Sequence, residues 1–252
     1  MSRVVLKKAD IFKGDLILVN AESGFKEPEG FDLVPVLGRE DILLERRAAA
    51  ALEKLVEKIG GRDDIVPVSG WRSQGEQQDI WDDTIINSGE EFTRRFVAVP
   101  GHSEHQTGLA IDLGLKMEHI DFICPEFPYD GICGEFRKIA PKYGFIERYP
   151  RGKEDITGIG HEPWHFRYVG APHGEVMAEM GLTLEEYTEL LRGYVLGERC
   201  LKSAGGAEIA YLPAKRCEDT ALEFEDDCRF SISGDNIGGF IITRWRGQDG
   251  NP

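Results

Sequence analysis

The chain has 252 residues, of which 41% are hydrophobic and 30% are charged, and a globular chain of this length buries a large core without disulfide bonds. Its 45 acidic side chains outnumber the 30 lysines and arginines, so the formal net charge is -15. This charge argues against nucleic acid and against an anionic membrane as partners, because both attract basic surfaces. No apolar run approaches the roughly 20 residues of a membrane-spanning helix, which excludes that class of protein.

The N-terminal segment contains no apolar stretch of the length found in a secretory signal, about 7 to 15 residues. We therefore expect a cytoplasmic protein. The five cysteines include no Cys-x-x-Cys pair, which favours free thiols in a reducing compartment.

Hydrophobic periodicity predicts short strands that alternate with a few helices. Strands are expected at 15–20, 65–69, 109–115 and 166–169, and helices at 40–59, 74–88, 134–143 and 183–196. The segment 109–115 alternates strictly between apolar side chains and small or polar ones, which indicates a strand with one buried face. Pro141 is expected to interrupt the helix that contains it. This order of elements favours an α+β fold over a doubly wound sheet.

The C-terminal part of the chain has a different character. Three short strand patterns occur there, at 208–212, 230–233 and 238–246, with no motif that suggests chemistry. We therefore expect a catalytic domain over 1–196 and a small β-rich appendage over 197–252, whose role the sequence does not indicate.

The segment His161-Glu-Pro-Trp-His165 matches the H-E-x-x-H pattern, in which two histidines on one face of a helix bind zinc. Here Pro163 lies between the histidines, and proline disfavours the interior of a helix. We therefore expect Glu162 and His165 to take part in a site and His161 to lie outside it.

His105 and Asp112 form a second candidate pair. Their odd separation would put them on opposite faces of one flat strand, so they can meet only if the chain bends between them. Gly108 is the expected place for that bend. A buried aspartate needs a partner, and a metal ion would serve; ordinary hydrogen bonds are the alternative interpretation of this pair by itself.

Three motifs occur in order along the chain: S-G-W-R-S at 69–73, S-x-H-x-x-G-x-A-x-D at 103–112 and E-P-W-H at 162–165. Over residues 40–190 this combination resembles the D-Ala-D-Ala zinc metallopeptidases of glycopeptide resistance, the VanX dipeptidases and VanY carboxypeptidases. It is most similar to their bifunctional VanXY branch. The resemblance implies a small, mostly antiparallel sheet flanked by helices, as in D,D-peptidase and hedgehog domains.

The resemblance also implies one zinc ion per chain, with His105, Asp112 and His165 as ligands and an open position for water. It implies that Glu162 is the general base, which takes a proton from that water and passes it to the leaving amine. Arg72 would stabilise the oxyanion of the tetrahedral intermediate. Cobalt or another divalent ion would also suit such nitrogen and oxygen ligands.

Three further residues match the family's substrate pocket. Gln77 and Ser103 are expected to bind substrate by hydrogen bonds, and Trp164 either lines the pocket or packs in the core. Glu104 replaces the small hydroxyl residue of the dedicated dipeptidases, which argues against activity on the dipeptide alone.

The implied activity is hydrolysis of the D-Ala-D-Ala dipeptide and removal of the terminal D-Ala from peptidoglycan precursor pentapeptides. The expected partners are these peptides, with no nucleic acid and no membrane, and the chain is expected to be a monomer or homodimer. One alternative is an L-Ala-D-Glu endopeptidase on the same scaffold. Another is a zinc-binding module without turnover, which the presence of Glu162 argues against.

Overall fold

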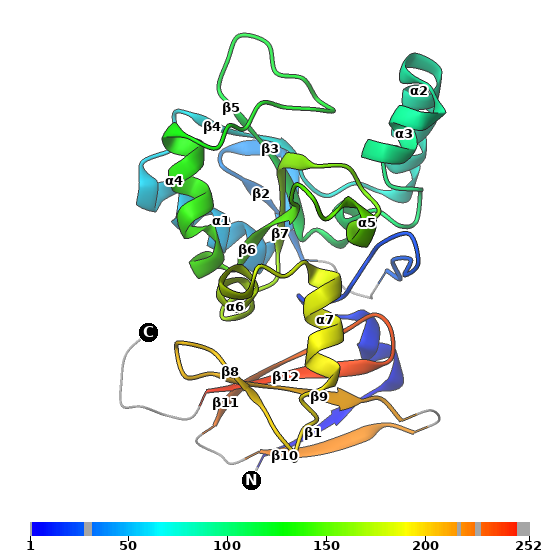
Figure 1. The fold of residues 1–252 in the computed structure, drawn as a ribbon, viewed down its shortest axis with the longest axis vertical. Coiled ribbons are helices and arrows are strands. Elements are labelled where there is room, and N and C mark those ends of the chain that lie inside the picture. The colour runs from blue at the N-terminus through cyan, green and yellow to red at the C-terminus, as the bar shows by residue number, and fades with distance from the viewer. Residues whose placement is uncertain (1, 28–31, 216–217, 225–227, 246–252) are drawn as a thin grey trace. The chain divides into compact units, whose positions relative to one another are not determined.

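The computed structural model describes residues 2–27, 32–215, 218–224 and 228–245. The chain divides into two compact units (Figure 1): Val19–Thr183, and Met1–Leu18 together with Leu184–Pro252. This division differs from the boundary expected at 196/197, because the N-terminal segment and the helix that begins at Leu184 belong to the smaller unit.

The larger unit contains a four-stranded sheet, a two-stranded sheet and several helices. Its strands are β2 (Leu33–Val36), β3 (Arg39–Glu45), β4 (Ile65–Ser69), β5 (Ala110–Leu115), β6 (Phe145–Tyr149) and β7 (Glu162–Tyr168). Its helices are α1 (Arg46–Ile59), α2 (Gln74–Ser88), α3 (Glu90–Phe96), η2 (Glu104–Thr107), α4 (Gly131–Ile139), η3 (Ala140–Tyr143), α5 (Glu154–Thr157) and α6 (His173–Met180), where η marks a 3₁₀ helix.

The four-stranded sheet has the order β4-β5-β7-β6, and all of its neighbouring strands are antiparallel. Helices α1 and α4 pack against one another beside it (Figure 1). Mixed helices and small antiparallel sheets confirm the predicted α+β class. Strand β5 is buried on both faces from Ala110 to Leu113, and not on one face as its alternation predicts. The reason is that its polar face carries Asp112, which other side chains cover.

A cluster of aromatic rings fixes strand β7 from the side opposite its polar residues. Phe166 of β7 packs edge to face against Phe136 of α4 and against Phe127. All three rings are almost wholly buried. Because successive side chains of a strand point to opposite faces, this contact turns the neighbouring His165 away from the aromatic cluster.

The helix expected over 40–59 begins only at Arg46, because the preceding residues form β3 and pair with β2. Ile42 and Leu44 are buried with a period of two, a signal that the longer helical pattern obscured. From Ala48 onward one face of the helix is buried, and Gly60 ends the helix in the left-handed conformation.

The strand expected at 15–20 does not form. Residues 16–18 are buried, but their amides bond to irregular partners: Leu16 N donates to Ser233 Oγ, and Leu18 N donates to the Asp235 carbonyl. The apolar run therefore predicted correctly that these residues are buried, but it predicted wrongly that they form a β-strand.

The smaller unit is rich in β-structure. It contains β1 (Ser2–Leu6), η1 (Lys8–Phe12), α7 (Leu184–Arg192), β8 (Leu201–Lys202), β9 (Glu208–Pro213), β10 (Thr220–Phe224), β11 (Arg229–Gly234) and β12 (Gly239–Trp245). One sheet has the order β11-β12-β9-β8, and a second pairs β1 with β10. The three predicted C-terminal strands correspond to β9, β11 and β12, with Arg246 outside the described residues. Leu6, Ile11, Phe240 and Ile242 form the core of this unit.

Helix α7 is shorter than the predicted 183–196, whereas α4 is followed by η3 at Pro141, as expected. Across the described part of the chain, every helix falls short of the length and apolar character that a bilayer crossing requires.

Gly108 is constrained by both its backbone and its neighbours. It has a φ of 69°, and a Cβ added there would lie 2.8 Å from Leu33 Cδ2. Gly60 has a similar φ of 67° but no atom within 4 Å of an added Cβ. We expect Gly60→Ala to lower the free energy of unfolding by about 1–2 kcal/mol, the cost of the left-handed conformation, and Gly108→Ala to lower it further. Urea denaturation checks this, and equal losses would contradict the contribution of the Leu33 contact.

Candidate metal and catalytic site

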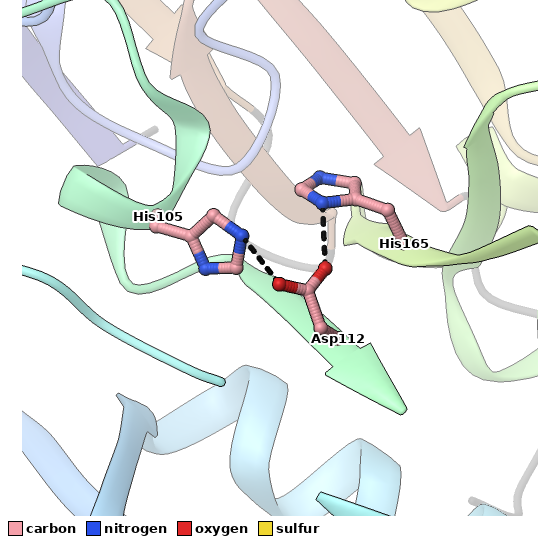
Figure 2. Close-up of side chains that lie close together, drawn as sticks. All are labelled: His105, Asp112 and His165. Carbon is pink, nitrogen blue, oxygen red and sulfur yellow. Dashed lines mark hydrogen bonds and ion pairs between the residues drawn. The ribbon is translucent and has the colours of Figure 1, made fainter. Parts of the chain in front are cut away.

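Three buried side chains from separate elements meet beside the four-stranded sheet. His105 comes from η2, Asp112 from β5 and His165 from β7. Each offers one ligand atom, and these atoms all lie within 4.8 Å of one another. Figure 2 shows Asp112 between the two imidazole rings. Its Oδ2 lies 3.1 Å from His105 Nε2, and its Oδ1 lies 2.9 Å from His165 Nδ1.

Strand register and one turn produce this convergence. Asp112 pairs directly with His165 across β5 and β7, so their side chains point to the same face. Gly108 ends η2 in the left-handed conformation and bends the chain, which brings His105 back over Asp112. This is the bend that the odd spacing of His105 and Asp112 requires.

A backbone carbonyl fixes the ring of His105. Its Nδ1 lies 2.6 Å from the Gly70 carbonyl oxygen, and because a carbonyl can only accept, Nδ1 is the donor. Burial lowers the pKa of His105 to about 4, so the ring is neutral and Nε2 carries a lone pair. That lone pair faces Asp112 Oδ2.

The donor set fits a divalent cation. The lone pair of His105 Nε2 and the carboxylate of Asp112 face one another in a buried position, an arrangement that is unfavourable unless a cation lies between them. Burial raises the pKa of Asp112, but its contacts with His105 and His165 outweigh this and hold the pKa well below its usual range. Two imidazoles and one carboxylate are typical protein ligands of catalytic zinc.

His165 and Glu162 lie side by side on β7, with 3.7 Å between His165 Nδ1 and Glu162 Oε2. Burial by itself would lower the pKa of His165, but its contacts with Asp112 and Glu104 raise it to about 9. Burial raises the pKa of Glu162 to about 8. Glu162 is therefore a carboxylate with high proton affinity next to the three candidate ligands.

The H-E-x-x-H segment is a strand here and not a helix, since β7 begins at Glu162, four residues before the strand predicted at 166–169. His161 lies outside the cluster. Its Nε2 is 2.7 Å from the Tyr129 hydroxyl, and the two rings stack. The structure thus separates His161 from His165, as the proline between them led us to expect.

Arg72 is held from three directions. Its guanidinium donates to Ser69 Oγ at 2.9 Å, to Gln77 Oε1 at 3.0 Å and to Asp112 Oδ2 at 3.1 Å. Gln77 is fixed in turn by a bond from its Nε2 to the Ala98 carbonyl. Burial lowers the pKa of Arg72, and the nearby carboxylates of Asp112 and Glu162 oppose that shift.

All of the sequence-predicted site residues line one cleft. They are Arg72, Gln77, Ser103, His105, Asp112, Glu162, Trp164 and His165. Gln77 orients Arg72 in this structure, so its role toward substrate stays a prediction, as does that of Ser103. Trp164 lines the cleft and is only 8% exposed, and its contact with substrate stays a prediction.

Sequence reasoning missed part of the cleft and its support. Phe122 and Ile123 line the cleft from the segment after β5, and no motif marks them. Arg148 and Arg167 are wholly buried and contact Glu104. An arginine within a strand pattern gives no local sign of burial, because its partner is distant in sequence.

Comparisons with known proteins agree with this arrangement. The sequence model of the VanY family, described as D-alanyl-D-alanine carboxypeptidase, matches residues 41–171. The chain is 44% identical over 180 residues to the bifunctional D-Ala-D-Ala dipeptidase and D-Ala-D-Ala carboxypeptidase VanXYC of Enterococcus gallinarum. That match covers 70% of this chain and 94% of the relative.

Solved structures show the same likeness. The crystal structure of the vancomycin resistance D,D-dipeptidase VanXYg, in complex with a D-Ala-D-Ala phosphinate analogue, matches with a TM-score of 0.93 and 49% identity. The match covers 97% of this chain and 99% of that chain. A mutant of the D,D-pentapeptidase VanY from a VanB-type resistance cassette, in complex with Zn(II), matches with a TM-score of 0.57 and 29% identity, over 69% of this chain and 98% of that one.

Substitution of the two histidines of the H-E-x-x-H segment is expected to affect zinc affinity in opposite ways, with a large loss for one and none for the other. His165→Ala removes a candidate ligand, so we expect zinc affinity to fall by more than the roughly 10- to 100-fold that loss of an outer contact costs. His161→Ala removes a ring that contacts Tyr129, and we expect it to bind one zinc ion per chain as tightly as the unmodified protein. Competition with a chromophoric chelator measures both affinities, and equal losses would contradict the assigned ligand set.

Proposed function

The chain belongs to the VanY family of D-alanyl-D-alanine carboxypeptidases, and from this membership we propose that it is a zinc-dependent D,D-peptidase. Its proposed substrates are the D-Ala-D-Ala dipeptide and peptidoglycan precursor pentapeptides that end in it. The observation that carries the proposal is the convergence of His105, Asp112 and His165 with Glu162 and Arg72 in one cleft.

His105, Asp112 and His165 would hold the zinc ion. When bound, zinc supplies a Lewis acid that polarises a carbonyl and makes water a better nucleophile near neutral pH. The protein contributes the surroundings. Each of the three candidate ligands is only 4% exposed, and charge interactions are stronger in such a buried environment than in water.

Glu162 is the proposed general base. Its carboxylate opens into the same cleft as the ligands, 3.7 Å from a ligand nitrogen. A buried carboxylate with high proton affinity is suited to accept a proton from the attacking water and to deliver it to the departing amine. One carboxylate can perform both steps, because it gains a proton in the first and loses it in the second.

Arg72 is the proposed oxyanion donor. Its guanidinium is oriented by Ser69, Gln77 and Asp112, so it is fixed before substrate arrives. Donors that need no reorganisation stabilise the developing charge of a tetrahedral intermediate most effectively. Arginine also remains charged throughout the relevant pH range.

Activity on both dipeptide and pentapeptide is proposed because the relative VanXYC, at 44% identity, is named as bifunctional. The alternative activity is that of an L-Ala-D-Glu endopeptidase, and a peptide that contains only this bond distinguishes the two. A zinc module without turnover would not need a base, so the presence of a buried carboxylate, Glu162, beside the candidate ligands favours the peptidase.

The proposal is tested by release of D-Ala from the zinc-loaded protein. We expect release from free D-Ala-D-Ala and from a pentapeptide that ends in it, and none from a peptide that contains only an L-Ala-D-Glu bond. A chelator should abolish release, and added zinc should restore it. Stoichiometric zinc without release from either substrate would refute the proposal, and cleavage of the L-Ala-D-Glu peptide alone would support the endopeptidase.

Glu162→Gln removes the proton acceptor and keeps the shape of the side chain. We expect kcat to fall by about 10²- to 10⁴-fold, the usual contribution of a general base, while one zinc ion per chain remains bound. Steady-state assays of D-Ala release together with metal analysis check this. A variant that retains its zinc and more than a tenth of the activity would exclude Glu162 as the base.

Arg72→Lys keeps the positive charge but loses the planar fork that contacts three partners. We expect kcat to fall by roughly 10²- to 10³-fold, the cost of one lost oxyanion donor. The matched control is Arg46→Lys, because Arg46 makes an exposed paired contact with Asp32 and should leave kcat unchanged. An equal fall in kcat in both variants would show that the loss is not specific to Arg72.

A further inference from the structure

Glu104 is a buried charge that the proposed reaction does not use. It begins η2, directly before the ligand His105. Its Oε1 accepts from Arg148 Nε of β6 and from Arg167 Nη1 of β7, both at 2.8 Å. All three side chains are 0% exposed. Two arginines therefore anchor one oxygen of this carboxylate inside the protein.

The second oxygen is in an unusual position. Among the described residues, Glu104 Oε2 accepts no hydrogen bond, and His165 Nε2 likewise has no partner. The two atoms lie 3.7 Å apart. A buried polar atom without a partner is unfavourable, and a small shift of either group would join these two.

The direction of that bond follows from the chemistry of the two groups. A carboxylate held by two guanidinium groups acts only as an acceptor. The imidazole must therefore donate, which places the proton of His165 on Nε2. When the ring binds the ion as a neutral imidazole, its lone pair is then on Nδ1, the atom that faces Asp112 and Glu162.

We propose that Glu104 is a positioning residue for the metal centre, which accepts the Nε2–H of His165 and so fixes the tautomer whose Nδ1 binds the ion. The inference rests on the zinc site of the proposed function. His105 offers an internal comparison, because the Gly70 carbonyl takes its Nδ1–H and leaves Nε2 free to bind. The two ligands are thus oriented from outside, one by a carbonyl and the other by a carboxylate.

Glu104→Gln tests the direction of this bond. The amide oxygen would face Arg148 and Arg167, since both only donate, and the amide NH₂ would face His165 Nε2. To avoid two opposed donors, the ring must move its proton to Nδ1, which cannot then bind the ion. We expect zinc affinity to fall by about 10- to 100-fold, the usual cost of losing an outer contact to a ligand, in competition with a chromophoric chelator.

The matched control is Glu147→Gln. Glu147 also pairs with an arginine, Arg137, at 2.6 Å, and it contacts His161, which is not a candidate ligand. We expect its zinc affinity to equal that of the unmodified protein. Thermal unfolding of the two variants without metal measures how much stability each loses with its ion pair, independently of zinc affinity. Unchanged affinity in Glu104→Gln, or an equal loss in Glu147→Gln, would overturn the proposal.

A second measurement needs no variant. In the zinc-loaded protein with ¹⁵N-labelled histidine, His165 should carry its proton on Nε2 and none on Nδ1, and His105 should show the reverse. A proton on His165 Nδ1 would overturn the proposal even if Glu104→Gln failed to fold. Zinc binding with the expected tautomers but without D-Ala release would refute the proposed peptidase and leave this inference standing.

Discussion

The site depends on one pairing, Asp112 of β5 opposite His165 of β7 in an antiparallel ladder. Directly opposed residues share a face, so the ladder brings a carboxylate and an imidazole together without help from flexible loops. The aromatic contact of Phe166 with Phe136 on the other face holds β7 in this register. A shift of one residue would turn His165 into the aromatic cluster and Phe166 toward the cleft.

Around this pairing the protein buries several charges and balances them. Arg72 contacts Asp112, and Glu104 contacts Arg148 and Arg167. Buried ions are costly unless they are paired and hydrogen-bonded, and these pairs meet that condition with donors from different elements. The same contacts fix the rotamers of groups that line the cleft, so stability of the interior and orientation of the site depend on shared interactions.

Local patterns predicted most of the secondary structure, and the exceptions have a common cause. The alternation of 109–115 predicted a strand that forms, and the helix predicted over 40–59 forms from Arg46 onward. The apolar run at 15–20 gave burial without a strand, because its amides bond to Ser233 and Asp235, far away in the chain. The helical pattern over 40–59 did not reveal strand β3, because pairing with β2 decides the conformation of these residues. In each case a segment outside the pattern determined the hydrogen bonding, a neighbouring strand for β3 and residues far away in the chain for 16–18.

The sequence by itself determined which side chains could form a site. The three motifs at 69–73, 103–112 and 162–165 sufficed for the family resemblance. Pro163 sufficed to argue against a helical metal motif, because an interior proline removes a backbone donor and its ring clashes with the preceding turn. Only the tertiary structure decided that Glu104 lies between two buried arginines with one oxygen toward His165. That arrangement depends on strands β6 and β7 and helix η2, whose contacts join residues 104, 148 and 167, and no local pattern encodes a contact across such separations.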